Sequence, residues 1–203
     1  MLQLNQTLTL ASQSPRRKEL LEQMQLPFTT NVSNVEEPRR EEGECVASYV
    51  QRLASLKSKE VAKRVDGVVI GADTVVSIDG DLLGKPPTKR AAAELLRRLS
   101  GRTHDVYTGV SIVVGTEERT FYERTRVVFR ALDEAIIRAY VATGDSLDKA
   151  GGYGIQTLGA LCVERIEGDY NNVVGLPVAR LVHVLMEEGI VEPKKVTRFA
   201  SDD

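Results

Sequence analysis

The stretch "THDVYTGVSIVVGTEERTFYERTRVVF" (residues 103–129) contains two long runs rich in β-branched and aromatic residues. The runs Thr103–Val114 and Arg119–Phe129 flank the polar segment "GTEE", an arrangement that predicts an antiparallel hairpin. Elsewhere strand-like and helix-like periods alternate, which is typical of an α/β protein. We therefore predict an α/β fold whose sheet is mixed rather than purely parallel.

The segments before the hairpin alternate between strand and helix patterns. The apolar run Val68–Ala72 has the composition of a central strand buried on both faces. Nearer the hairpin, Thr88 is the expected cap of a helix and Gly101 its stop. The apolar face of that helix comprises Ala92, Leu95, Leu96 and Leu99. The other expected elements are strands at Thr7–Ala11 and Phe28–Val32, a helix beginning at Pro15, the charged loop "NVEEPRREEGE" and a long helix over Glu44–Val65.

The segments after the hairpin continue the alternation. We expect a helix near Asp133–Ala142, then the glycine-rich segment "KAGGYGIQTLGA", a strand through Val163–Ile166 and a helix from Leu176 to Glu188. The polar residues after Pro193 are expected to fray.

The composition excludes several classes of protein. The 203 residues include 27 basic and 29 acidic ones, for a net charge of −2, so no global field favours nucleic acid or a membrane as partner. Cys45 and Cys162, the two cysteines, are too few for a disulfide scaffold or a thiolate metal cluster. The start resembles no signal peptide and no apolar run is long enough to cross a bilayer. We expect a soluble protein of the cytoplasm.

The segment "SPRRK" at residues 14–18 places positively charged side chains at the N-terminus of a predicted helix, which already carries a partial positive charge. Ser14 can cap the helix and Pro15 suits its first position. Arg16, Arg17 and Lys18 then oppose the helix dipole unless an anion joins them. The pattern is that of a phosphate site, with a solvated basic turn as the alternative.

Asp73 directly follows the apolar run of the predicted central strand. A carboxylate there needs a cation, a metal ion or a cleft, because burying it alone is costly. It is a candidate general base or metal ligand, and Gly71 would allow a ligand or another backbone to come close. A carboxylate that caps a loop or pairs with a structural lysine remains an equal alternative.

Two lysines and a glutamine complete the candidates. Lys57 falls on the apolar face of the helix at Glu44–Val65, where it either snorkels to solvent or reaches across a cleft. Lys85 stands in the stiff turn "GKPP", which lacks the features of a Walker A loop. Gln156 offers a donor and an acceptor within glycines that permit a flat ligand to approach, although an ordinary flexible connection explains those glycines too. His104 and His183 are too isolated for a histidine metal cluster, and no nucleophile elbow supports a serine triad.

Several of these segments, in order, resemble the Maf family of nucleoside triphosphate pyrophosphatases. The matching motifs are "LASQSPRRKELL", "VEEP", "LASLK", "VIGADTVV", "GKP", "LRRLSGRTHDVYTGV", "DKAGGYGIQTLGA" and "GDYNNVVGLP". The resemblance implies a mixed, twisted sheet flanked by helices, in two lobes around a nucleotide cleft, as in inosine triphosphate pyrophosphatases. It implies one domain over residues 1–192, a polar tail over residues 193–203, and homodimers.

The resemblance also implies roles for individual residues. Asp73 matches the family's catalytic acid, and Arg16, Thr74 and Gln156 match the specificity positions of the branch that acts on thymidine and uridine triphosphates. The acid of the "V-D-E" segment falls on Glu37. The implied phosphate-binding residues are Ser14, Arg16, Arg17, Lys57 and Lys85. Glu37 and Asp73 would hold a divalent cation, Mg²⁺ or alternatively Mn²⁺.

The implied reaction is attack of water on the α-phosphorus of a nucleoside triphosphate, which releases pyrophosphate. Positioning and electrostatics dominate such catalysis. The alternative is a regulator of cell division and septum formation that binds nucleotides without turnover. Asp73 argues against it, because a carboxylate repels phosphate in a site built only to hold it. A nucleotidyltransferase would need an acceptor site for which no motif is present.

Overall fold

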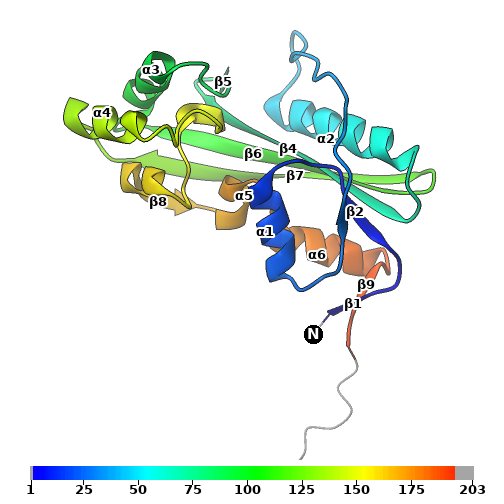
Figure 1. Cartoon of the computed structure of the whole chain (residues 1–203). Helices are drawn as coiled ribbons and strands as arrows, with labels where there is room; N and C mark the ends of the chain where they lie inside the picture. Colours follow the sequence, from blue (N-terminus) through cyan, green and yellow to red (C-terminus); the bar gives the residue numbers. More distant parts are fainter. Residues whose placement is uncertain (1, 195–203) are drawn as a thin grey trace, which may run out of the picture.

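A mixed seven-stranded sheet forms the centre of the molecule in the computed structural model, which describes residues 2–194 (Figure 1). Its strands lie in the order β3-β2-β4-β6-β7-β8, and β5 pairs with β4 outside this path. The strands are β2 (Leu8–Leu10), β3 (Thr29–Thr30), β4 (Val68–Ile78), β5 (Asp81–Leu83), β6 (Thr103–Val114), β7 (Glu117–Phe129) and β8 (Val163–Glu167). Because β2 pairs in parallel with both β3 and β4, and the other pairs are antiparallel, the predicted mixed α/β fold is confirmed.

The predicted hairpin is the longest pairing in the sheet. β6 and β7 pair from Thr103↔Val128 to Val114↔Glu117. On its other edge β6 pairs antiparallel with β4. β4 continues to Ile78, so the expectation that Asp73 follows the end of this strand is wrong. Asp73 lies in the middle of β4, opposite Gly109 of β6, because the β-branched residues after it extend the strand.

Helices cover both faces of the sheet, with α2 on one face and α1 and α6 on the other (Figure 1). They are α1 (Pro15–Gln23), α2 (Val46–Ala62), α3 (Lys89–Leu99), α4 (Glu134–Ala142), α5 (Tyr170–Val174) and α6 (Val178–Glu187). A Cβ atom on Gly71 would lie 2.3 Å from the carbonyl oxygen of Ala54, and one on Gly109 would lie 2.3 Å from that of Val50. These two glycines therefore let the backbone of α2 rest directly on β4 and β6, which is the close approach predicted for Gly71.

Short elements were the main omission of the sequence prediction. They are β1 (Leu2–Leu4), β9 (Val191–Pro193), β5, α5 and the 3₁₀ turns η1 (Ala150–Gly152) and η2 (Leu158–Cys162). β1 and β9 form a separate antiparallel pair, so Pro193, the first residue of the tail expected over residues 193–203, ends a strand. Residues 195–203 of that tail lie outside the described residues. The caps of α3 agree with prediction: Thr88 Oγ1 accepts from the Ala91 N–H at 3.1 Å, and Gly101 has φ +66°.

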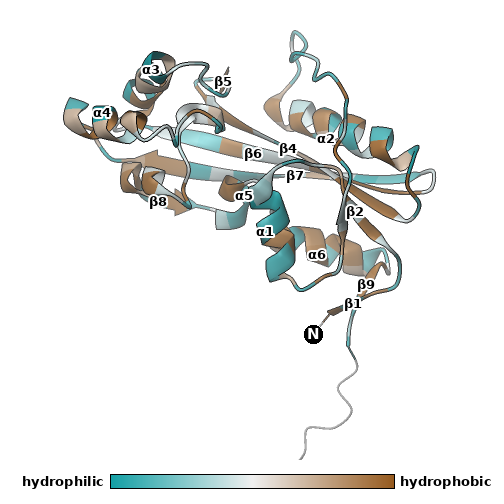
Figure 2. Ribbon diagram, viewed as in Figure 1, coloured by the Kyte–Doolittle hydropathy of each residue, from teal (hydrophilic) through white to brown (hydrophobic). Residues whose placement is uncertain are grey.

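Two large apolar clusters pack against the sheet. One joins α1 and α6 to residues of β2, β4 and β6, and the other joins α3 and α4 to β6 and β7. Figure 2 shows α6 mainly hydrophobic and α1 mainly hydrophilic, as expected for an α1 that buries only Leu20 and Leu21. The division of residues 1–192 into two lobes stays a prediction. Among the described residues, no helix has the length and apolar character needed to span a membrane.

Candidate active site

A cleft of about 740 Å³ brings all the predicted site residues together. It is bordered by the start of α1, the loop before α2, the middle of β4, the turn at Lys85 and the segment 148–157. The predicted residues that line it are Ser14, Arg16, Arg17, Glu37, Lys57, Asp73, Thr74, Lys85 and Gln156.

Because side chains alternate along a strand, the neighbouring residues Asp73 and Thr74 of β4 lie on opposite faces of the sheet. Asp73 shares its face with Gly71, on which α2 rests, and so it meets Lys57 of that helix. Thr74 faces the other way and meets Arg17 of α1. Two neighbouring residues of one strand therefore contact helices from both sides of the sheet.

Lys57 bridges two carboxylates at the wall of the cleft. Its Nζ lies 2.6 Å from Asp73 Oδ1 and 2.7 Å from Glu37 Oε1. The Lys57 side chain is 13% exposed, so its ammonium group points to these two acids rather than into bulk solvent. Asp73 Oδ2 has no hydrogen-bond partner within residues 2–194, which leaves one oxygen of the buried acid available to a ligand or water.

Burial and charge act in opposite directions on the two acids. Burial raises the pKa of the Asp73 carboxyl, and the charges of Lys57 and Arg17 offset part of that rise. Partial burial also raises the pKa of Glu37, but the hydrogen bond and charge of Lys57 outweigh it, so this pKa lies below its usual value. The Asp73 carboxylate is consequently the stronger base of the two.

Arg17 points into the protein rather than into the open cleft. Its Nε donates to the Gly175 carbonyl at 2.8 Å, and its two terminal nitrogens donate to the Ala72 carbonyl and to Thr74 Oγ1, each at 2.9 Å. Burial lowers the pKa of this guanidinium. Arg17 thus ties α1 to β4, and its direct contact with phosphate stays a prediction.

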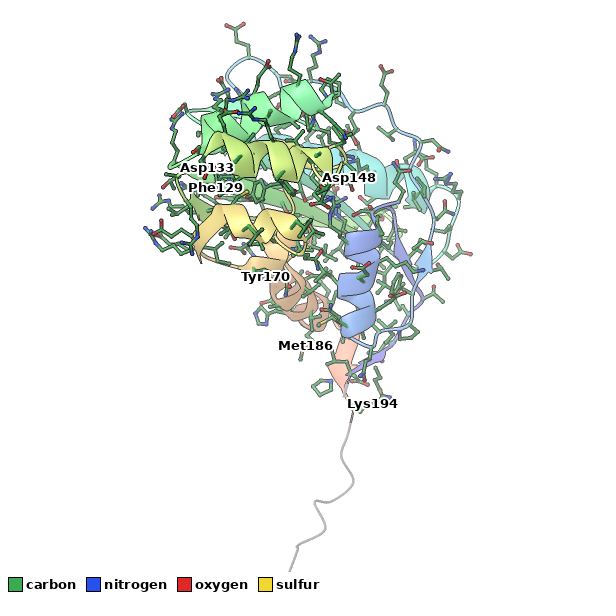
Figure 3. The ribbon with its side chains drawn as sticks, turned by 60° about the vertical axis from the view of Figure 1, so that its left-hand side comes forward. Phe129, Asp133, Asp148, Tyr170, Met186 and Lys194 are labelled. Atoms are coloured by element: carbon green, nitrogen blue, oxygen red, sulfur yellow. The ribbon has the colours of Figure 1, made fainter. Side chains whose placement is uncertain are left out.

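The start of α1 differs from the expected cap. Ser14 occupies the N-cap position, but its side chain makes no capping bond. Instead, Ser12 Oγ accepts from the Ser14 N–H at 3.1 Å and from Arg17 Nη1 at 3.3 Å. The sequence pattern does not single out Ser12, although it opens the same "SQS" segment. Arg16 Nη1 lies 3.1 Å from Asp148 Oδ2, and Figure 3 shows Asp148 near the beginning of α1.

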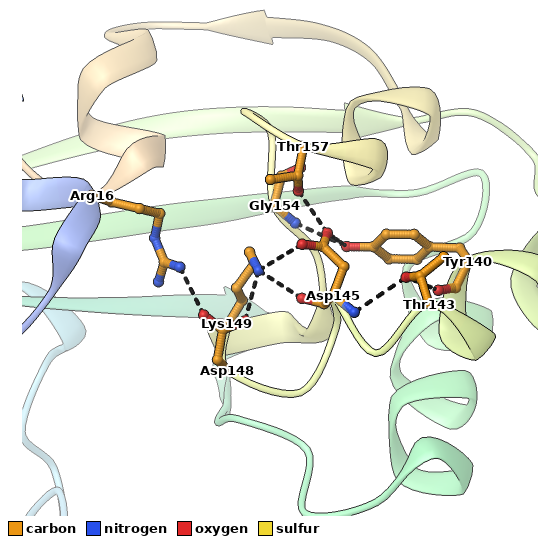
Figure 4. Close-up of polar contacts among 8 residues, drawn as sticks. All are labelled: Arg16, Tyr140, Thr143, Asp145, Asp148, Lys149, Gly154 and Thr157. Atoms are coloured by element: carbon orange, nitrogen blue, oxygen red, sulfur yellow. Dashed lines mark hydrogen bonds and ion pairs between the residues drawn. The ribbon is translucent and has the colours of Figure 1, made fainter. Parts of the chain in front are cut away.

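Gln156 and Lys85 are exposed at the rim, and neither side chain has a hydrogen-bond partner in the described part of the chain. A polar network of Tyr140, Asp145, Lys149 and Thr157 contacts the glycine-rich segment around Gln156 (Figure 4). The sequence prediction missed this network. The spacing of Asp145 and Lys149, four residues apart, was the available signal.

The histidines and cysteines lie apart from this chemistry. His104 is buried with its Nε2 2.8 Å from the Tyr153 hydroxyl, and burial lowers its pKa to about 4. His183 pairs with Glu187 at the surface. Cys45 is exposed and Cys162 is buried, both as free thiols. Within residues 2–194 no group of three or more histidine, cysteine or acidic side chains could hold a metal ion alone.

The structure is an α/β protein in which a mixed sheet carries a cleft whose cationic side chains surround the buried Asp73. The chain belongs to the Maf-like protein family, whose model matches residues 7–188. A dTTP/UTP pyrophosphatase of Bacillus anthracis is 50% identical over 188 residues, covering 89% of this chain and 95% of that one. A dTTP/UTP pyrophosphatase of Bacillus velezensis is 50% identical over 184 residues, covering 90% and 97%. Among solved structures, a HAM1 protein from Coxiella burnetii aligns with a TM-score of 0.43 at 16% identity, over 64% of this chain and 73% of that chain, a likeness too low to carry an argument.

Proposed function

We propose that this protein hydrolyses nucleoside triphosphates to the monophosphate and pyrophosphate, with dTTP and UTP as preferred substrates. The observation that carries the proposal is the buried Asp73, inside a cleft that begins at a basic helix start. One of its oxygens is paired to Lys57, and the other has no partner among residues 2–194. The names of the relatives support the same reaction. They do not favour the alternative of a regulator without turnover.

Asp73 is assigned as the general base. It accepts a proton from the water whose oxygen attacks the α-phosphorus, and the bond from the α-phosphorus to the bridging oxygen breaks as pyrophosphate leaves. The raised pKa of Asp73 suits this role, because a stronger base takes a proton more readily.

The cations of the cleft balance the charge of the triphosphate. Arg16, Lys57 and Lys85 line the cleft, and the N-terminus of α1 adds positive potential. Charge that develops on the phosphate oxygens and the leaving group is thereby stabilised. Arg17, which donates a hydrogen bond to Thr74 Oγ1, also contributes its charge.

The residues present fit a divalent cation, for which we propose Mg²⁺. Asp73 and Glu37 supply hard oxygen donors within contact of one ammonium group. Mg²⁺ is typically held by one or two carboxylates together with substrate phosphates and water, and so needs no larger cluster of protein ligands. When bound, it would neutralise phosphate charge.

Gln156 is assigned to the base. Uracil and thymine present an N–H beside a carbonyl oxygen, which a primary amide can match with its acceptor and its donor. The exposed amide of Gln156 at the rim of the cleft supports this assignment. We also propose Arg16 and Thr74 as specificity residues on the basis of the family resemblance.

The same resemblance leads us to propose a homodimer, and the two free thiols support a reducing compartment such as the cytoplasm. Size-exclusion chromatography with light scattering tests the first proposal. A link to septum formation would be tested by cell division in a strain that lacks the protein.

A panel of eight ribo- and deoxyribonucleoside triphosphates, assayed with Mg²⁺ and with products separated, tests the function. We expect pyrophosphate and monophosphate, with dTTP and UTP turned over fastest. Orthophosphate and a diphosphate would place the attack at the γ-phosphorus and contradict the proposal.

A further inference from the structure

A second lysine lies between two carboxylates in the segment that leads to Gln156 (Figure 4). Lys149 is 7% exposed. Its Nζ donates to Asp148 Oδ1 at 2.6 Å, to Asp145 Oδ1 at 3.0 Å and to the Asp145 carbonyl at 2.7 Å. An ammonium group has three N–H donors, so Lys149 has none left for a ligand and can act only through its neighbours.

Asp145 connects Lys149 to the glycine-rich segment through hydrogen bonds. Its Oδ2 accepts from the Thr157 hydroxyl at 2.6 Å and from the Tyr140 hydroxyl at 2.7 Å, and Tyr140 in turn accepts from the Gly154 N–H at 3.2 Å. The segment is thus held on both sides of Gln156. A Cβ atom on Gly154 would lie 2.5 Å from Lys149 Cε, so the lysine stem also packs against this backbone.

Asp148 connects Lys149 to the start of α1 through hydrogen bonds. While Oδ1 accepts from Lys149, Oδ2 accepts from Arg16 at 3.1 Å. A continuous chain of charged hydrogen bonds therefore runs from Arg16 through Asp148 and Lys149 to Asp145 and Thr157 (Figure 4). Charge-assisted hydrogen bonds of this kind fix geometry more strongly than neutral ones.

We propose that Lys149 is a positioning residue that sets Arg16 and Gln156 relative to each other and thereby determines which base the cleft accepts. This inference rests on the proposed function. Without the ammonium group, Asp145 and Asp148 would repel each other across a partly buried space. Arg16 and the segment 154–157 would then lose their common support, and small misplacements in a cleft have large kinetic effects.

The test compares Lys149→Met, which keeps the length of the side chain but removes its charge, with Lys89→Met as control. Lys89 donates to the Ala142 carbonyl at the surface, 2.9 Å away, and has no contact with the chain of bonds described above. The measured quantity is the ratio of kcat/KM for UTP to that for CTP. We expect Lys149→Met to lower this ratio on the order of ten- to a hundredfold, mainly through a higher KM for UTP. The control should keep the wild-type ratio.

Thr157→Val is the second variant and decides the matter if Lys149→Met does not fold. It removes one donor to Asp145 at an exposed position, and we expect the ratio to fall roughly three- to tenfold, with recovery in Thr157→Ser. A purely structural role would lower the melting temperature and the activity on all nucleotides equally, leaving the ratio unchanged. An unchanged ratio in an active enzyme would overturn this inference alone, whereas a wild-type protein that hydrolyses no triphosphate would overturn the proposed function and the inference with it.

Discussion

Two lysines that line the cleft, Lys57 and Lys149, each lie between two carboxylates, yet their surroundings differ. Lys149 is enclosed by acceptors, and the carboxylate of Asp145 is bonded through both oxygens. Lys57 has two acidic partners, and Asp73 keeps one oxygen without a partner among the described residues. We call these groups the closed cluster (Asp145, Asp148 and Lys149) and the open cluster (Glu37, Lys57 and Asp73).

The difference separates two uses of the same residue types. A network whose donors and acceptors are all engaged rigidifies its surroundings and has no capacity for chemistry. A buried acid with an unused oxygen and a raised pKa can still bind water or exchange a proton. We therefore expect changes in the open cluster to appear in turnover, and changes in the closed cluster to appear in base selection and stability.

The largest effect is expected for Asp73→Asn in the open cluster. Turnover should fall roughly 10²- to 10⁴-fold, the usual contribution of a positioned general base, while the KM for UTP stays close to that of the wild type. Stopped assays of pyrophosphate release with saturating UTP measure this. Asp81→Asn, which alters an exposed pair with Arg98, is the matched control and should remain fully active.

The thermal stability of Asp73→Asn is a second quantity to measure on the same variant. Because the folded-state pKa of Asp73 is raised, the folded protein binds this proton more tightly than the unfolded chain. The charged carboxylate therefore lowers stability as the pH rises above its ordinary value of 3.8 and through the folded-state pKa. We expect the Asn variant to melt no earlier than the wild type at pH 7. A variant that unfolds would assign Asp73 to structure rather than to catalysis.

A somewhat smaller effect is expected for Lys57→Met. The kcat for UTP should fall roughly 10²- to 10³-fold, because one cation that stabilises the developing charge is lost. Lys57 also lowers the pKa of Asp73, alongside Arg17 and against Glu37. Its removal should therefore move the acidic limb of the pH profile of kcat/KM to higher pH. Lys59→Met on the same helix, which breaks an exposed pair with Glu118, should leave both quantities unchanged, and a limb that moves to lower pH would contradict the assignment.

Gln156→Glu is expected to have a moderate effect confined to some bases. The substitution removes the donor to the base carbonyl. The kcat/KM for UTP and dTTP should fall by a factor that corresponds to roughly 1–3 kcal/mol. The values for CTP and GTP in the same preparations serve as internal controls. Equal losses on all four nucleotides would mean that Gln156 supports the segment or the phosphates instead of the base.

The smallest effect on activity is expected for Tyr140→Phe beside the closed cluster. Asp145 loses a donor and the Gly154 N–H loses its acceptor, so the free energy of unfolding should fall by about 1–2 kcal/mol. Urea titration measures this change. The kcat for UTP should stay within about twofold of the wild type. A large loss of turnover without a loss of stability would remove the distinction between the clusters.

Local patterns predicted the parts of the fold that depend on neighbouring residues. The hairpin, the cap at Thr88 and the stop at Gly101 each follow from a few adjacent side chains. The pair of β1 and β9 does not, because Leu2 and Pro193 are joined only in space and three-residue strands show no clear period. The sequence pattern predicts too short a β4, because Asp73 ends its apolar run. Tertiary contacts with β6 and α2 override that local signal.

The sequence predicts residues that gather in one place, but it predicts neither their connections nor the network beside them. All the residues expected from the sequence line one cleft. The inward direction of Arg17, the bonds of Ser12 and the enclosure of Lys149 could not be predicted. Each depends on acceptors from distant segments, such as Gly175 and Ala72, that come together only in the folded chain.

The most direct test of the central claim, that the open cluster directs water to the α-phosphorus, is the position of the oxygen that water donates. Wild-type enzyme would hydrolyse UTP in water enriched in ¹⁸O, and mass spectrometry would locate the label. We expect one ¹⁸O in UMP and none in pyrophosphate. Label in pyrophosphate or orthophosphate would show attack at another phosphorus and would contradict the claim.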